Sequence, residues 1–162
     1  MIRVGILTAS DKGAAGQRED KSGQVLKEMV EARGWQVAEY ALLPDDRIEL
    51  EHTMAAWCDE GLVDLLLTTG GTGFSRRDVT PEATKAIGER EVPGIPEAMR
   101  FYSLAITKRA MLSRGTAVIR GCTLIVNLPG SPKGARENLE AVMDTLEHGI
   151  QILMGEDGEC GG

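Results

Sequence analysis

The chain has few aromatic residues and no excess of basic charge, which argues against a nucleic acid as its ligand. Aromatic residues make up 4% of the 162 residues, and 18 Lys and Arg residues are outnumbered by 25 Asp and Glu residues, for a formal net charge of −7. Binding to a nucleic-acid backbone requires a basic face that displaces counterions. Binding to single strands also relies on aromatic side chains on which bases stack. We therefore expect no nucleic-acid partner.

Long apolar runs and clustered metal ligands are missing as well. No apolar run approaches the ~20 residues of a transmembrane helix, and the apolar N-terminal stretch is too short for a secretion signal. Cys58, Cys122 and Cys160 form no close pair, and His52 and His148 add no cluster, whereas zinc ligands are closely spaced. The sequence predicts a reduced, cytoplasmic protein with no membrane segment or structural metal, in which Cys58 and Cys122 are small buried apolar residues.

Short apolar segments alternate with amphipathic ones along the chain. The expected strands are 2–9, 35–43, 62–68, 117–119 and 123–127, and the expected helices are 22–33, 46–60, 81–89, 96–110 and 133–154. This alternation indicates an α/β fold in which a mainly parallel sheet is covered by helices on both faces. We expect one domain over residues 1–154, followed by a flexible, acidic, Gly-rich tail at 155–162.

In such folds ligands bind beyond the carboxyl ends of the parallel strands. The loops 10–21, 44–46, 69–80 and 128–132 should therefore share one edge of the sheet. These loops and the first turn of the helix that follows also contain basic residues, which we expect to form a local basic pocket that attracts an anionic substrate despite the negative net charge. The residues concerned are Lys12, Lys21, Arg76, Arg77 and Lys133.

The glycine-rich loop at 69–73, Thr-Gly-Gly-Thr-Gly, is the most informative segment. Glycines allow sharp turns and a close approach of the backbone to a ligand, and the exposed amides of such a loop can bind an anion. The loop is neither a P-loop nor a G-x-G-x-x-G motif. A tight strand-to-helix turn is the structural alternative to a ligand site.

The residues after this loop allow both structural and functional interpretations. Thr80 followed by Pro81 suits the start of a helix, with Thr80 as the capping residue. Asp78 suits coordination of a Mg²⁺ ion that bridges phosphates, and it equally suits an ion pair with Arg76 or Arg77. Arg side chains favour phosphate or carboxylate groups.

Two further helix starts carry polar residues. Ser131 and Pro132 can cap and begin the last helix, where Lys133 indicates either an anionic ligand or a solvated side chain. Asp46 and Glu49 have the spacing of a capping box. In this register Asp45 has no capping duty, so we expect Asp45→Ala to change stability by no more than ~0.5 kcal/mol.

The chain resembles the molybdopterin-binding family of molybdenum-cofactor biosynthesis, which includes MogA-type adenylyltransferases and MoaB-type proteins. The resemblance covers residues 1 to about 153. It is carried by Leu-Pro-Asp-Asp at 43–46, Thr-Thr-Gly-Gly-Thr-Gly at 68–73 and Arg-Asp-Val-Thr-Pro-Glu at 77–82. Pro-Gly-Ile-Pro-Glu-Ala-Met-Arg at 93–100, Leu-Ser-Arg at 112–114 and Asn-Leu-Pro-Gly-Ser-Pro-Lys at 127–133 complete it.

The resemblance implies a three-layer α/β/α domain, commonly a homotrimer, and a nucleotidyltransferase activity. AMP would pass from Mg-ATP to the terminal phosphate of molybdopterin, with release of pyrophosphate, and the product would be handed to an enzyme that inserts molybdate. Asp45 and Asp78 match the catalytic carboxylates, with Asp78 as a Mg²⁺ ligand. The matching substrate positions are Ser10, Asp11, Gly70, Gly71, Thr72, Gly73, Arg76, Ser113, Asn127, Pro129, Gly130 and Ser131. Glu97 lies in a motif but receives no role.

Two other functions are compatible with these motifs. A MoaB-type trimeric scaffold would bind molybdopterin without turnover, although the presence of both carboxylates favours the enzyme. A domain related to competence-damage proteins would hydrolyse nucleotide derivatives, which the short chain makes a more distant alternative. An adenylyltransferase needs no protein nucleophile, because the molybdopterin phosphate attacks. The absence of a recognisable Ser–His or Cys–His pair therefore agrees with the adenylyltransferase interpretation.

Overall fold

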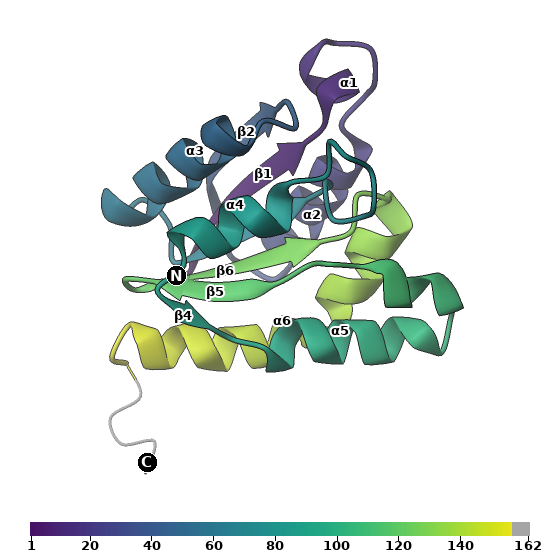
Figure 1. Ribbon diagram of the computed structural model, residues 1–162. Helices are drawn as coiled ribbons and strands as arrows, with labels where there is room; N and C mark the ends of the chain where they lie inside the picture. Colours follow the sequence, from purple (N-terminus) through teal and green to yellow (C-terminus); the bar gives the residue numbers. More distant parts are fainter. Residues whose placement is uncertain (157–162) are drawn as a thin grey trace.

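A sheet of six strands forms the centre of the computed structural model, which describes residues 1–156 (Figure 1). Its strand order is β2-β1-β3-β6-β5-β4, and the three pairings among β2, β1, β3 and β6 are parallel. β5 and β4 extend the sheet in antiparallel fashion. The strands are β1 (Arg3–Ala9), β2 (Gln36–Leu43), β3 (Leu65–Thr69), β4 (Arg90–Glu91), β5 (Ala117–Arg120) and β6 (Thr123–Leu128).

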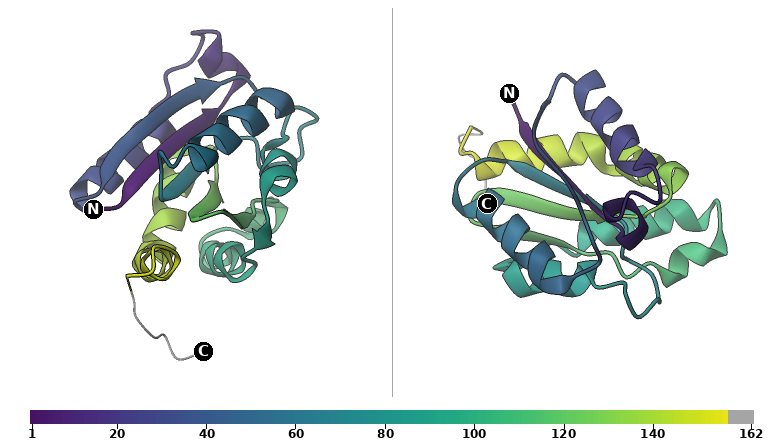
Figure 2. Two further views of the ribbon diagram at one scale, coloured as in Figure 1. Left: turned by 90° about the vertical axis from the view of Figure 1, so that its left-hand side faces the viewer. Right: turned by 90° about the horizontal axis from the view of Figure 1, so that it is seen from above.

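Helices cover both faces of this sheet, as Figures 1 and 2 show. One apolar core lies between the sheet and helices α2, α5 and α6, and a second lies between the sheet and helices α3 and α4. The predicted α/β architecture with a mainly parallel sheet and three layers is therefore confirmed. The helices are α1 (Asp11–Ala14), α2 (Lys21–Ala32), α3 (Arg47–Asp59), α4 (Thr80–Ile87), α5 (Gly94–Leu104) and α6 (Pro132–Leu153), with a 3₁₀ helix, η1 (Lys108–Leu112).

The central strand β3 begins with three consecutive leucines, and its place in the sheet explains this pattern. Leu65 and Leu67 belong to the core under α2, α5 and α6, whereas Leu66 belongs to the core under α3 and α4. All three side chains are fully buried. A strand with helices on both sides needs apolar residues at every position, not only at alternate ones.

The expected element boundaries are correct to within a few residues, with three differences. Two short elements are added, the helix α1 and the strand β4. The expected helix 96–110 is wrong, because the chain breaks after α5 and resumes as η1. At the break Thr107 is extended, and its hydroxyl accepts a bond from the amide of Arg109 at 3.3 Å. Threonine thus supplies a local bond that competes with a continuous helix.

The helix α4 begins one residue earlier than expected. Val79 occupies its capping position, and Thr80 is already helical. The hydroxyl of Thr80 is buried with no partner in the described residues instead of capping the helix. The capping role that the sequence suggests for Thr80 is therefore wrong.

The described cysteines differ from each other in exposure. Cys58 is half-buried and Cys122 is exposed, so the prediction that both are buried is wrong for Cys122. Cys160 and most of the expected tail, residues 157–162, lie outside the described residues. Within residues 1–156, no helix has both the length and the apolar character that crossing a membrane requires.

The packing of α3 on β1 depends on the absence of a side chain at Gly5. A Cβ atom there would lie 2.9 Å from Cε3 of Trp57 and 3.1 Å from Cγ1 of Val63. We predict that Gly5→Ala lowers the free energy of unfolding by about 1–3 kcal/mol, because the core becomes overpacked. Gly149→Ala in α6 is the control, since a Cβ there meets nothing within 4 Å.

The control should be more stable by roughly 0.5–1 kcal/mol, because alanine suits a helix interior better than glycine. Urea unfolding of both variants measures the two changes. Equal effects of the two substitutions would contradict close packing at Gly5.

Candidate functional site

The loops that follow β1, β2, β3 and β6 meet at the carboxyl edge of the parallel strands, as the sequence predicts. Between them lies a cavity of about 740 Å³, a size typical of sites for small molecules. Seven of the predicted site residues line it: Ser10, Asp45, Gly70, Gly71, Asp78, Gly130 and Ser131.

The floor of this cavity is formed by backbones in close contact. Gly70 has φ +93°, and a Cβ atom on it would lie 2.4 Å from the carbonyl oxygen of Ala9. On its other side, a Cβ atom on Gly130 would lie 3.2 Å from the Cα of Gly70. The hydroxyl of Thr69 donates to the carbonyl of Pro129 at 2.6 Å. Side chains are excluded where the three loops touch, which leaves the main chain accessible to a ligand.

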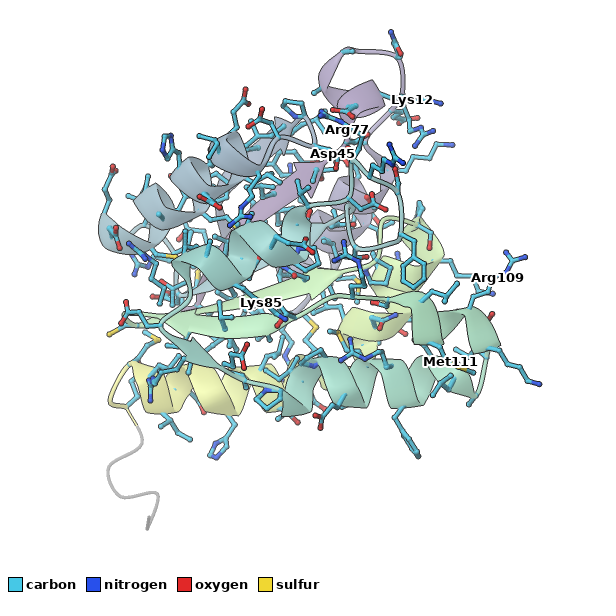
Figure 3. All side chains as sticks on the ribbon, viewed as in Figure 1. Lys12, Asp45, Arg77, Lys85, Arg109 and Met111 are labelled. Atoms are coloured by element: carbon cyan, nitrogen blue, oxygen red, sulfur yellow. The ribbon has the colours of Figure 1, made fainter. Side chains whose placement is uncertain are left out.

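Asp45 and Asp11 join the loops after β1 and β2 by two reciprocal bonds. The amide of Asp11 donates to Oδ2 of Asp45 at 3.0 Å, and the amide of Asp45 donates to Oδ1 of Asp11 at 3.0 Å. Asp11 also forms a bidentate pair with Arg77, whose Nε and Nη2 lie 2.9 Å from its two carboxylate oxygens. Figure 3 shows Asp45 and Arg77 close together at this edge.

The second oxygen of Asp45 is buried and has no hydrogen-bond partner within residues 1–156. Burial raises the pKa of Asp45. The nearby carboxylates of Asp11 and Asp78 also raise it, while the amide of Asp11 and the charge of Arg77 oppose the shift. The pKa of Asp11 itself is lowered, chiefly by its bonds from Arg77. The neighbours of Asp45 therefore compensate its ionised form only in part.

Asp78 lines the same cavity as Asp45, and its carboxylate lies close enough to raise the pKa of Asp45. Oδ2 of Asp78 accepts a bond from the amide of Ser75 at 3.0 Å. The ion pair with Arg77 that the sequence leaves open is not formed, because the guanidinium of Arg77 is bound to Asp11. Arg76 is exposed and does not line the cavity. The carboxylate of Asp78 is thus available at the cavity wall.

The predicted basic pocket is formed only in part. Of its five expected cations, Lys21 lines the cavity, where Arg18 joins it. Lys133 is largely exposed, 3.8 Å from a carboxylate oxygen of Glu137. The cavity wall also carries four carboxylates, so its field is mixed: Glu19, Asp20, Asp45 and Asp78.

A second, smaller cavity of about 280 Å³ lies on the other side of the glycine-rich loop. Ser131 lines both cavities, so they adjoin. The basic side chains of Arg100 and Arg109 reach this cavity from α5 and η1. It contains most of the remaining predicted site residues, namely Thr72, Gly73, Ser113 and Pro129.

The described residues contain no cluster of three or more side chains of the kind that would by itself hold a metal ion. Two carboxylates with one unpartnered buried oxygen nevertheless suit Mg²⁺. This ion is commonly bound by one or two carboxylates together with waters and substrate phosphates. Asp45 and Asp78 therefore fit a magnesium ion that arrives with a phosphate ligand.

The sequence matches a known family model over residues 5–148, described as a probable molybdopterin binding domain. The chain belongs to this molybdopterin-binding family. It is 42% identical over 156 residues to a molybdopterin adenylyltransferase of Helicobacter pylori strain J99, covering 95% of this chain and 89% of the relative. It is 43% identical to a molybdopterin adenylyltransferase of Escherichia coli K12 over 155 residues, covering 92% of this chain and 80% of that relative.

Solved structures agree with this membership. The crystal structure of the molybdopterin biosynthesis enzyme MoaB from Thermus thermophilus superimposes with a TM-score of 0.91 at 50% sequence identity. The match covers 96% of this chain and 98% of that one. Relatives titled MoaB and relatives named adenylyltransferase therefore share this fold.

Not every family motif residue reaches a cavity. Asn127 is buried, donates to the hydroxyls of Thr68 and Thr84 at 2.9 Å each, and accepts from the amide of Thr116 at 3.1 Å. These bonds fasten β6 to its neighbours. Asp11 also lines neither cavity. Its carboxylate accepts hydrogen bonds from the amide of Asp45 and from the guanidinium of Arg77.

Sequence reasoning overlooked Arg114 beside the candidate site. Its guanidinium donates to the carbonyls of Gly73 and Asp78 at 2.8 Å each and pairs with the carboxylate of Glu82. The Leu-Ser-Arg motif at 112–114 contains the signal, because its arginine directly follows the matched Ser113.

The structure confirms the cap at Asp46 and gives Asp45 a bond that the sequence does not predict. The side chain of Asp46 accepts from the amide of Glu49 at 3.0 Å. Because Asp45 accepts from the amide of Asp11, it too has a structural bond. We predict that Asp46→Ala and Asp45→Ala each lower the free energy of unfolding by about 1 kcal/mol, through loss of a helix cap and of a loop bond respectively.

Thermal or urea unfolding at neutral pH measures both changes. An Asp45→Ala variant as stable as the parent would show that the bond from the Asp11 amide contributes no more than the burial of the Asp45 carboxylate costs.

Proposed function

We propose that the chain is a molybdopterin adenylyltransferase, which transfers AMP from ATP to the terminal phosphate of molybdopterin and releases pyrophosphate. The observation that carries this proposal is the meeting of Asp45 and Asp78 at one cavity, beside a glycine-rich loop. The names of the relatives that match nearly the whole chain support it.

The two adjoining cavities suit a reaction between two substrates. In the proposed reaction, a terminal phosphate oxygen of molybdopterin attacks the α-phosphorus of ATP. The bond from that phosphorus to the oxygen of the β-phosphate breaks, and pyrophosphate leaves. We place the reacting phosphates near Ser131, because this residue lines both cavities. Free amides at the start of α6 favour anions there.

The protein contributes positioning and charge compensation, since such a transfer needs no covalent help from a side chain. The open backbone around Gly70 and Gly71 brings amides within reach of phosphate oxygens. Lys21 and Arg18 add positive charge on the same cavity. Asp45 and Asp78 would hold Mg²⁺, which when bound neutralises phosphate charge and orients the groups.

A MoaB-type binding module is the second candidate, because a 50% identical structure carries the MoaB name, although its title calls that protein a biosynthesis enzyme. Such a module would bind molybdopterin without turnover. The presence of an aspartate at both carboxylate positions of the cavity, Asp45 and Asp78, favours the enzyme. Both candidates imply molybdopterin as a ligand, so only a measurement of pyrophosphate release from ATP separates them.

The proposed setting is the cytoplasm, and the adenylylated product would pass to an enzyme that inserts molybdate. Cys58 and Cys122 are free thiols, as in most proteins of a reducing compartment. This agrees with the proposed location.

We predict that Asp78→Asn lowers pyrophosphate release by about 100-fold or more, comparable with the loss of one strong electrostatic contact at a reacting phosphate. Molybdopterin binding should persist, because asparagine keeps the shape of the side chain. A coupled pyrophosphate assay and fluorescence titration with molybdopterin measure the two properties.

Asp46→Ala is the matched control, since Asp46 is exposed and caps α3 outside the cavity. It should turn over at the parental rate. Normal turnover of the Asp78→Asn variant would contradict a catalytic role for Asp78. A parent chain that binds molybdopterin and releases no pyrophosphate would favour the MoaB-type module.

We further propose that the chain forms a homotrimer. Large apolar side chains are exposed over the end of α5 and over η1, with exposed fractions of 82% for Phe101 and 64% for Met111. Figure 3 shows Met111 and Arg109 on this part of the molecule. Several large exposed apolar side chains on neighbouring elements are typical of interaction surfaces. The α5–η1 patch consists of Phe101, Tyr102, Leu104, Ile106, Met111 and Leu112.

A second copy seated on this patch would also border the smaller cavity, because Leu112 belongs to both. We predict three chains per particle by sedimentation equilibrium at micromolar concentration, and dissociation in the Met111→Glu variant. Ile48→Glu is the control, since Ile48 is 58% exposed on α3, away from the patch. A monomeric parent, or equal effects of both substitutions, would contradict the proposal.

A further inference from the structure

The loop that carries Asp78 has little packing of its own. Residues 74–77 are all exposed, and the side chain of Phe74 is 70% exposed. Within the loop, the amide of Asp78 donates to the carbonyl of Ser75 at 3.0 Å, and the amide of Ser75 donates back to the carboxylate. These bonds shape a turn. Arg77 also ties the loop to Asp11, and the amide of Thr80 donates to the carbonyl of Gly71 at 3.2 Å.

Arg114 connects the two ends of this loop from outside. Its Nε donates to the carbonyl of Gly73 and its Nη2 to the carbonyl of Asp78, both at 2.8 Å. Its own amide donates to the carbonyl of Thr72 at 2.9 Å. The third nitrogen, Nη1, pairs with Glu82 in the first turn of α4. One planar guanidinium thus spans the base of the loop and ties it to a helix.

The segment around Arg114 is itself held by rigid elements. Arg100 of α5 donates to the carbonyl of Gly115 at 2.9 Å. Thr116 and Asn127 exchange two bonds, from the amide of Thr116 to Oδ1 of Asn127 and from the amide of Asn127 to the carbonyl of Thr116. Arg114 therefore relates the loop to α5 and to β6 at the centre of the sheet.

We infer that Arg114 is a positioning residue, which fixes the carboxylate of Asp78 opposite Asp45 without touching the ligands that these carboxylates face. Arg114 lines a separate cavity of about 430 Å³ and not the one that contains the two carboxylates. Its action must pass through the carbonyls of Gly73 and Asp78. The expected effect on kcat rests on the proposed function, whereas the expected anchoring of the loop does not.

The identity of the side chain follows from the geometry of its partners. Three acceptors lie around one group, which matches the planar fork of arginine and its several fixed donors. Lysine offers a single charged nitrogen on a flexible stem and cannot reach all three acceptors at once. Arg114→Lys should therefore retain the charge and lose most of the positioning.

Arg120 supplies a matched control. Its guanidinium also has three contacts, two with the carboxylate of Asp59 and one with the carbonyl of Ile87 at 2.8 Å. It lies at the end of β5, which runs antiparallel to β6 and so ends at the edge of the sheet opposite the candidate site. Arg120→Met removes a comparable set of bonds without disturbing the loop.

The test combines hydrogen exchange of the free protein with steady-state kinetics. In Arg114→Met, exchange of the peptide that contains the amides of Ser75, Asp78 and Thr80 should accelerate about tenfold or more, as expected when a local opening becomes easier. The kcat for pyrophosphate release should fall by roughly 100-fold, the scale of a small misplacement of a reacting group. KM for ATP should change far less. Arg114→Lys should show the same pattern to a smaller degree, and Arg120→Met neither effect.

Three results would overturn the inference. They are unchanged exchange of the loop in Arg114→Met, a normal kcat despite faster exchange, and an equal loss of kcat in Arg120→Met. If Arg114→Met does not fold, Arg114→Lys is tested by the same two measurements. A parent chain without turnover would refute the proposed function instead, and the exchange of the loop would still decide whether Arg114 anchors it.

Discussion

The close approach of three backbones at Gly70 is the contact on which the rest of the candidate site depends. The parallel pairing of β1, β3 and β6 brings the ends of these strands together. Only a residue without a side chain, at positive φ, fits between the carbonyl of Ala9 and the chain at Gly130. Because the loops touch through their main chains, their amides and short polar side chains line the cavity. A bulkier loop would separate the strand ends and fill the space that a ligand needs.

The second constraint is electrostatic. The carboxylates of Asp11 and Asp78 lie close enough to Asp45 to raise its pKa, because like charges repel. Arg77 compensates Asp11 directly, and the amides of the two loops compensate one oxygen each of Asp11 and Asp45. Asp78 has the amide of Ser75, and Asp45 keeps an oxygen without a partner. The protein thus compensates the charge of Asp11 and leaves Asp45 and Asp78 for a cation or a phosphate-bound metal, as proposed for the transfer of AMP.

The accuracy of sequence reasoning varied with the range of the interactions involved. Asp46 was correctly assigned as a cap, because its partner Glu49 is three residues away and the geometry of a helix start fixes the distance. The fold followed from short apolar segments such as 62–68 that alternate with amphipathic ones, a pattern typical of a sheet covered on both faces. The bonds between Asp11 and Asp45 join residues 34 positions apart, and no local pattern reports them. Arg77 lies 66 positions from its partner Asp11, and Arg114 lies 41 positions from Gly73, so charge alone could not assign their roles.

Membership of a motif did not separate ligand-facing residues from structural ones. Asn127 lies in a motif, yet its side chain is fully occupied by two threonines and an amide. Thr80 was assigned to a cap, yet its hydroxyl is buried and unpartnered, as is Oδ1 of Asp45. A Cβ atom on Gly71 would lie 2.3 Å from the hydroxyl oxygen of Thr80 and 3.1 Å from Oδ1 of Asp45. Two oxygens without a hydrogen-bond partner among the described residues therefore lie beside Gly71 of the glycine-rich loop. A buried polar atom without a partner lowers the stability of the fold by about 1–3 kcal/mol. A ligand or a metal-bound water that bonds to both oxygens would remove this cost, but only while the ligand is bound.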